Sequence, residues 1–234
     1  MKLGILDWGV GGLFALEMAR ARQPALDIVY LSDAGNTPYG KQPRDRLTRS
    51  VARACRTLQD HGASCLLVAC HSASTVLPGG AHGVIRPEAV PPDAHLVLVL
   101  GGARTIRSGQ WRRALERPGR SIQQRIAQPL SAHVEAGTHD SPQALAELAR
   151  VLAPVGRPQA VVLACTHYPA MSEAIQRSLP SARLIDPVEV AIRELDLRPG
   201  SAQLEVLTTG PAPPLARALA RLQLTPGTGI RQLL

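Results

Sequence analysis

AVVLACTHYP, residues 160–169, is an apolar run that ends in Ala-Cys and then turns polar. CLLVACHSAS, residues 65–74, follows the same pattern earlier in the chain. A short apolar run bounded by polar residues predicts a strand that is buried in a parallel sheet. The chain therefore has two strand ends at which a cysteine, Cys70 or Cys165, is the first residue after the apolar run.

Five further apolar runs predict strands of the same kind. They are LGIL (3–6), IVYL (28–31), HLVLVL (95–100), RLID (183–186) and LEVL (204–207). Helical patterns lie between several of these runs, as in LFALEMARA after the first of them. Because strands and helices alternate, the sequence predicts an α/β fold with mostly parallel sheets.

The segment 78–93 is rich in proline and glycine and predicts a boundary between two similar lobes. We expect residues 1–93 to form an N-terminal α/β lobe that residues 188–234 complete. Residues 94–187 would form the second α/β lobe, so that each lobe carries one of the two cysteines. In open α/β sheets the reactive crevice lies at the carboxyl ends of the strands, which places the site in the cleft between the lobes.

Composition narrows the class of protein. The N-terminus lacks the features of a signal peptide and no apolar run is long enough to span a bilayer, which predicts a cytoplasmic protein without membrane contact. The net charge of +8 indicates either an anionic partner or only an arginine-rich, solvated surface. The arginines are scattered, however, and aromatic residues are only 3%, so nucleic acid is a poor candidate and a small anionic substrate fits the charge.

The four cysteines are too few for a disulfide framework in a reducing compartment, and neither they nor the histidines show metal-ligand spacing. We expect Cys55 and Cys65 to be packing residues inside a helix and a strand. Cys70 and Cys165 differ, because hydroxyl and imidazole groups follow each of them. Backbone N–H groups at a helix start and a nearby imidazolium would lower the pKa of such a thiol.

Two reactive thiols that face one crevice would supply a base and an acid on opposite faces of a carbon centre. Two other polar clusters also follow predicted strands. Asp7 precedes the glycine-rich turn WGVGG, and Asp33 precedes the polar loop AGNTPYG. By local sequence alone, Asp7 could equally be a helix N-cap, and the glycine-rich turn does not match a nucleotide-binding motif.

Five motifs in order resemble those of the glutamate racemases, in the aspartate/glutamate racemase superfamily. That family typically shows D-S-G-x-G-G-L, D-x-x-x-x-P-Y-G, A-C-N-T-A-S, V-E-x-G and G-C-T-H-Y-P. This chain shows DWGVGGL (7–13), DAGNTPYG (33–40), ACHSAS (69–74), VEAG (134–137) and ACTHYP (164–169). The resemblance runs over nearly the whole chain and implies cofactor-independent racemisation of glutamate, which supplies D-glutamate for the bacterial cell wall.

The resemblance also implies residue roles. Cys70 would take the α-proton from D-glutamate with the help of Asp7, and Cys165 would take it from L-glutamate with the help of Glu135 and His167. The positions that match the family's substrate site are Trp8, Pro38, Tyr39, Gly40, His71, Ser72, Thr105 and Thr166. A homodimer is compatible with the resemblance, but the sequence does not determine the oligomeric state.

Several positions depart from the family pattern. Trp8 stands where the family has a small serine, His71 where it has asparagine, Ser72 where it has threonine, and Gly102 where it often has threonine. An indole at a tight site either points away or reshapes the pocket. His71 could be a proton relay, a thiolate partner of Cys70 or a simple polar contact. The stretch after Cys70 is poor in helix formers, so a long helix is not expected there.

The sequence is compatible with three functions. The first is a two-cysteine glutamate racemase, and the second is a racemase or isomerase for another acidic or related amino acid. The third is a catalytically silent homologue that binds a protein or nucleic acid through its arginines. Retention of both thiols favours an enzyme over the third.

Overall fold

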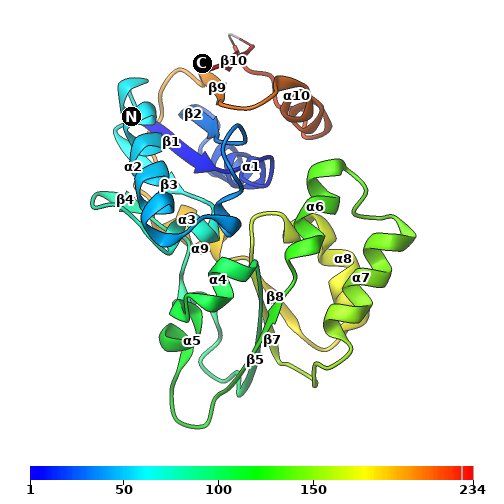
Figure 1. The fold of residues 1–234 in the computed structure, drawn as a ribbon. Helices are drawn as coiled ribbons and strands as arrows, with labels where there is room; N and C mark the ends of the chain where they lie inside the picture. The colour runs from blue at the N-terminus through cyan, green and yellow to red at the C-terminus, as the bar shows by residue number, and fades with distance from the viewer. Residues whose placement is uncertain (228, 234) are drawn as a thin grey trace.

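The computed structural model describes residues 1–227 and 229–233, which form two parallel sheets flanked by helices (Figure 1). The first sheet has the strand order β10-β9-β2-β1-β3-β4. Its strands are β1 (Lys2–Asp7), β2 (Asp27–Ser32), β3 (Cys65–Val68), β4 (Ala81–His82), β9 (Leu204–Thr208) and β10 (Ile230–Gln232). The chain thus leaves this sheet after β4 and returns to it with β9, which pairs with β2.

The second sheet has the strand order β6-β5-β7-β8. Its strands are β5 (Leu96–Gly101), β6 (Ser121–Ile126), β7 (Ala160–Ala164) and β8 (Arg183–Ile185). The central strands of both sheets are fully buried, as in β5, where residues 97–100 are 0% exposed. Burial on both faces explains why these strands are continuous apolar runs. The predicted α/β class with two parallel sheets is confirmed.

Helices cover both sheets. They are α1 (Leu13–Arg22), α2 (Arg44–Asp60), α3 (His71–Ser74), α4 (Ala103–Arg107), α5 (Gln110–Leu115), α6 (Gln128–Ala136), α7 (Pro142–Leu152), α8 (Ser172–Ser178), α9 (Pro187–Glu194) and α10 (Ala212–Arg221). Three short 3₁₀ turns are η1 (Tyr39–Lys41), η2 (Pro87–Ala89) and η3 (Tyr168–Met171). In α2, buried Leu47, Val51, Ala54 and Leu58 recur at helical spacing and form one face against the first sheet.

The candidate catalytic residues lie at or just after the carboxyl ends of strands. β1 ends at Asp7, Cys70 follows β3 by two residues, and Cys165 follows β7 directly. The helix after Cys70 is only four residues long, which confirms that no long helix follows this cysteine. The first half of the molecule is the part built on the sheet of β1, and the second half is the part built on the sheet of β5. In Figure 1, α6 of the second half is drawn next to α1 of the first half.

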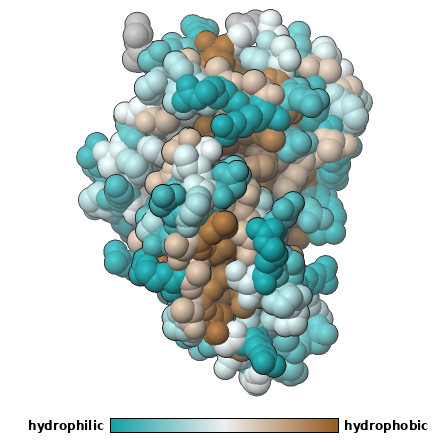
Figure 2. All heavy atoms as spheres, turned by 90° about the vertical axis from the view of Figure 1, so that its right-hand side faces the viewer, coloured by the Kyte–Doolittle hydropathy of each residue, from teal (hydrophilic) through white to brown (hydrophobic). Residues whose placement is uncertain are grey.

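The face that carries α6, α7 and α8 is mostly hydrophilic, with a band of apolar atoms in its lower half (Figure 2). Leu145 of α7 and Ile126 of β6 are two of the large apolar side chains that stay exposed. Among the described residues, no helix is both long and apolar enough to cross a bilayer.

Candidate active site

A cavity of about 620 Å³ lies between the carboxyl ends of β1 and β3 in the first sheet and that of β7 in the second. The residues proposed from the sequence as catalytic or substrate-binding all line it. They are Asp7, Trp8, Pro38, Tyr39, Gly40, Cys70, His71, Ser72, Thr105, Glu135, Cys165, Thr166 and His167. The fold therefore brings together side chains that are up to 160 residues apart in the sequence, from Asp7 to His167.

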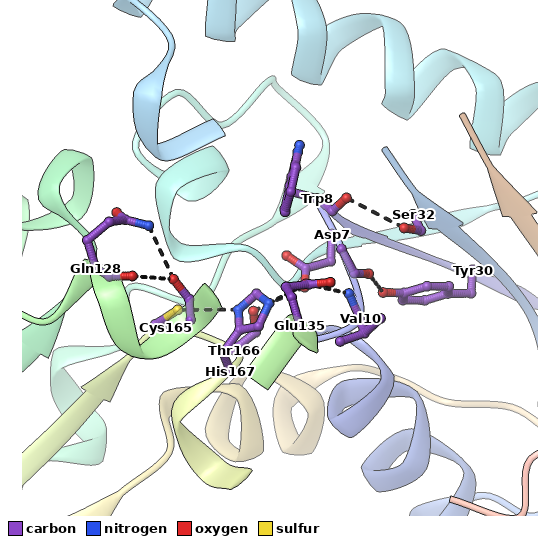
Figure 3. A network of polar contacts seen from close by, with 12 residues as sticks. Asp7, Trp8, Val10, Tyr30, Ser32, Gln128, Glu135, Cys165, Thr166 and His167 are labelled. Atoms are coloured by element: carbon purple, nitrogen blue, oxygen red, sulfur yellow. Dashed lines mark hydrogen bonds and ion pairs between the residues drawn. The ribbon is translucent and has the colours of Figure 1, made fainter. Parts of the chain in front are cut away.

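Cys165, His167 and Glu135 form a linear relay on the second half of the molecule (Figure 3). The Cys165 Sγ lies 3.5 Å from His167 Nδ1, and His167 Nε2 lies 2.5 Å from Glu135 Oε1. The backbone N–H of Val10 donates to the same Glu135 oxygen at 2.9 Å, so the first half of the molecule holds the end of the relay. In this geometry His167 can accept the Cys165 proton and hold it as an imidazolium against Glu135.

The charges of His167 and Glu135 stabilise each other. Burial on its own would lower the pKa of His167, but Cys165 and the Glu135 carboxylate together raise it well above its usual value. Burial would likewise raise the pKa of Glu135, but the hydrogen bond and charge of His167, with the Val10 N–H, bring it below its usual value. The two partners therefore carry opposite charges at neutral pH.

Asp7 is fully buried at the wall of the cavity. Its Oδ2 accepts a hydrogen bond from the Thr166 hydroxyl at 3.0 Å, while Oδ1 has no partner among the described residues. Burial raises the pKa of Asp7, and the nearby charge of His167 only partly offsets this. The side chain makes no N-cap hydrogen bond to α1, so the alternative role as a helix cap is wrong.

Cys70 lines the same cavity from the first half. Desolvation raises the pKa of its thiol well above the usual value, and the charge of Asp7 adds to this. The backbone N–H groups of Ala73 and Ser72 act in the other direction but are outweighed. The expectation of a lowered Cys70 pKa is therefore wrong for this state, because burial and a neighbouring carboxylate oppose the helix start.

The environment of His71 also differs from what the sequence predicted. Its ring is 2% exposed, and burial lowers its pKa to about 3, so it is neutral. Neither ring nitrogen has a hydrogen-bond partner among the described residues, and the ring instead lies 6.1 Å from the Trp111 ring, centroid to centroid. His71 is thus neither an imidazolium beside Cys70 nor, in this state, a simple polar contact.

Trp8 lines the cavity, but its indole points away from the Glu135–His167 pair (Figure 3). The indole N–H donates to the Asn36 carbonyl at 2.8 Å, which ties the side chain to the 33–40 loop. The large side chain therefore forms part of the wall rather than filling the centre of the site.

The 33–40 loop is fixed by Asp33, which is buried. The hydroxyl of Tyr39 donates to Asp33 Oδ2 at 2.6 Å, and the hydroxyl of Thr209, after β9, donates to Oδ1 at 2.9 Å. The Tyr39 hydroxyl is thus engaged with Asp33. The C-terminal segment holds this loop in place and adds Pro214 of α10 to the cavity wall.

Cys55 is buried in α2, where desolvation raises its pKa to about 11, and Cys65 begins β3. Both lie outside the cavity. Within residues 1–227 and 229–233, no group of three His, Cys, Asp or Glu side chains could hold a metal ion.

The sequence did not single out several wall residues, among them Lys41, Gln128 and Ser131. Lys41 directly follows the PYG motif, which was a usable signal. Gln128 and Ser131 lie in α6, before the VEAG motif, in a stretch that matches none of the five motifs. Gln128 Oε1 accepts from the Ala103 N–H at 3.1 Å and so fixes the start of α4 next to the cavity.

The two α/β halves enclose two thiols, a thiol–imidazole–carboxylate relay and a buried acid, and groups of these kinds can transfer protons. Comparison with known proteins identifies the class. A family model described as Asp/Glu/Hydantoin racemase matches residues 88–195. Glutamate racemase from Aquifex aeolicus is 30% identical over 94% of this chain and 92% of its own length.

Solved structures agree with the sequence comparison. Glutamate racemase from Thermus thermophilus, in complex with β-chloro-D-alanine, is 28% identical to this chain, with a TM-score of 0.87. The alignment covers 99% of this chain and 96% of the Thermus chain. The Escherichia coli enzyme, in complex with L-glutamate and the activator UDP-MurNAc-Ala, is 25% identical, with a TM-score of 0.83 over 99% of this chain and 97% of its own. The chain belongs to the Asp/Glu racemase family and is an amino-acid racemase of the glutamate racemase type.

Proposed function

We propose that this chain interconverts L- and D-glutamate by moving the α-proton between Cys70 and Cys165. The observation that carries the proposal is the Cys165–His167–Glu135 relay in the same cavity as Cys70. For L-glutamate, the Cys165 thiolate takes the α-proton on one face, and the Cys70 thiol gives its proton to the carbanion on the other face. The product is D-glutamate, with Cys165 now a thiol and Cys70 a thiolate, and the reverse sequence converts the D enantiomer.

The charge state of the resting site supports this order of events. The raised pKa of Cys70 keeps its thiol protonated, as an acid must be at the start. His167 is held as an imidazolium next to Cys165, which places a positive charge beside the sulfur that acts as the base. Asp7, whose pKa is raised by burial, lies on the Cys70 side and can exchange a proton with that thiol.

The substrate would lie between these two sides. The Ser72 and Thr105 hydroxyls, which are 3.3 Å apart across the cavity, and the Thr166 hydroxyl are suited to hold carboxylate groups. The proposal uses only side chains of this chain and needs no cofactor. We further propose that the reaction takes place in the cytoplasm and supplies D-glutamate for peptidoglycan, as the resemblance implies.

Proton exchange tests the proposal directly. The purified protein is incubated with L-glutamate or D-glutamate in D₂O, and loss of the Cα proton is followed by NMR. We expect exchange with both enantiomers in the wild type. Cys70→Ala should abolish exchange with D-glutamate, and Cys165→Ala should abolish exchange with L-glutamate. Exchange with both enantiomers in either variant would contradict a two-thiol mechanism.

A second candidate keeps the chemistry and changes the substrate. Trp8 and His71 both line the cavity and both differ from the typical family residues. A panel of L-amino acids, scored by circular dichroism for loss of optical activity, separates the two candidates. Activity on another amino acid alone would replace glutamate as the substrate and leave the mechanism standing.

A further inference from the structure

A second cavity, of about 650 Å³, adjoins the catalytic one. Gly40, Lys41 and Gln128 line both cavities. One wall of the second cavity is η1 with the start of α2, from the first half of the molecule, and the other is α4, from the second half. In Figure 1, α4 of the second half lies just below α3 of the first half.

The charge of this second cavity is one-sided. Its lining includes four cationic side chains, Lys41 and Arg44 on one wall and Arg104 and Arg107 on the other. None of the described residues that line it is acidic. No ion pair joins any of the four to a carboxylate in the part of the chain that the structure describes.

Two of these cations, Arg44 and Arg104, are close enough to repel each other. Burial lowers the pKa of Arg104, and the charge of Arg44 across the cavity lowers it further. The Arg104 Nε is buried and has no hydrogen-bond acceptor among the described residues. A donor that is buried without an acceptor costs free energy, as do like charges at short range. A bound anion would remove both penalties.

The backbone adds to the positive potential. The 17-residue helix α2 begins at Arg44, at the cavity wall, and its N-cap residue Pro43 supplies no capping side chain. The first N–H groups of a helix and its dipole favour an anion at this end. Asp45 in the first turn is exposed and does not line the cavity.

We propose that this second cavity binds the phosphoryl group of a small phosphorylated molecule. Glutamate carries a net charge of only −1, whereas a phosphate ester or a diphosphate brings two or more charges to one end. The planar guanidinium fork pairs well with phosphate oxygens. The volume suits a small molecule, and a concave site without stacking aromatics does not suit a nucleic acid strand.

Calorimetry of the whole wild-type chain with inorganic pyrophosphate tests this assignment. At constant ionic strength we expect saturable binding of one pyrophosphate per chain. The double variant Arg104→Gln/Arg107→Gln should weaken binding by about tenfold or more, since it removes two charged donors that would pair with the phosphate oxygens. Arg44→Gln on the opposite wall should weaken binding independently, which covers the case in which the double variant does not fold.

The matched control is Arg183→Gln/Arg193→Gln, which removes the same charge from two exposed arginines outside both cavities. We expect its affinity for pyrophosphate to equal that of the wild type. ADP as a second ligand distinguishes a site for the phosphoryl group alone, with equal affinity, from one that also contacts a nucleoside, with higher affinity.

Three results would overturn the assignment. They are an absence of saturable binding, an equal loss in the control variant, and displacement of pyrophosphate by saturating L-glutamate. The last would place the anion in the catalytic cavity instead. None of these results depends on racemase activity, so the assignment and the proposed function fail independently.

Discussion

At the scale of single residues, Glu135 joins the two halves of the molecule at the wall of the cavity. One carboxylate oxygen accepts both the Val10 N–H of the first half and the His167 imidazole of the second. The sequence identified Glu135 only through the VEAG motif, because isolated acidic residues on a helix are common. Its contact with Val10 links segments 125 residues apart and has no local sequence signal.

Glu135→Gln should lower the pKa of His167, because the amide keeps the shape of the carboxylate but not its charge. His167 would then lose its proton at a lower pH than in the wild type. Because the imidazole could no longer hold the Cys165 proton as well, we expect proton exchange with L-glutamate to slow by about 10²-fold. NMR of the His167 ring protons across pH, together with Cα exchange in D₂O, measures both effects.

The same ion pair predicts how stability depends on pH. The lowered Glu135 pKa adds stability above its unfolded value, near 4.5, that is lost as pH falls through the folded pKa. The raised His167 pKa adds stability that is lost as pH rises through its own folded pKa. Glu135→Gln should therefore cost most between these limits. Glu17→Gln, an exposed change on α1, is the control, and a wild-type His167 titration in the Glu135 variant would refute the argument.

At the scale of elements, the sequence predicted the inner strands and the edge strand β8, but it missed the other edge strands. The strands that it missed, β4, β6 and β10, each lie at the edge of a sheet. Edge strands are short or half-exposed and do not need a continuous apolar run, as the polar sequence SIQQRI of β6 shows. The helix predicted from LFALEMARA, residues 13–21, agrees with α1 to within one residue.

The glycine-rich turn between β1 and α1 lies close to Glu135 of α6. A Cβ on Gly9 would lie 2.0 Å from Glu135 Oε1, so a side chain there would force the Glu135 carboxylate to move. Gly9→Ala should therefore displace the carboxylate and break its hydrogen bonds to Val10 and His167. We expect about 10²-fold lower activity and a loss of about 1–3 kcal/mol in the free energy of unfolding.

Gly79→Ala is the matched control for this change, because a Cβ there has no atom within 4 Å. Thermal unfolding and racemisation rates of the two variants should differ clearly. Wild-type activity and stability in Gly9→Ala would show that the Glu135 carboxylate can move without cost.

At the scale of the whole molecule, the cavity wall is made by segments from both ends of the chain. We propose that residues 1–93 with 188–234 act as one lobe and 94–187 as the other. The sequence could suggest this division from the proline- and glycine-rich segment and the two cysteines. It could not show that the C-terminal segment buttresses the 33–40 loop, or that scattered arginines gather in one cavity. Both depend on tertiary packing and not on periodicity.

Thr209 tests whether the C-terminal segment shapes the substrate site. Its hydroxyl donates to Asp33 Oδ1 at 2.9 Å and accepts the Gly35 N–H at 3.0 Å, yet it does not line the cavity. Thr209→Val keeps the volume and removes both hydrogen bonds, which should loosen the loop that carries Tyr39. Losing a hydrogen bond to a charged group costs about 1.5–3 kcal/mol, part of which should appear as a KM raised about fivefold or more.

The kcat of Thr209→Val should stay within about twofold of the wild type, because the two thiols and the His167 relay are not touched. Thr209→Ser keeps the hydroxyl and should restore the wild-type KM. Steady-state racemisation of both enantiomers gives the two parameters separately. A KM that does not change, or a serine variant that fails to restore it, would mean that the loop holds its shape without the C-terminal segment.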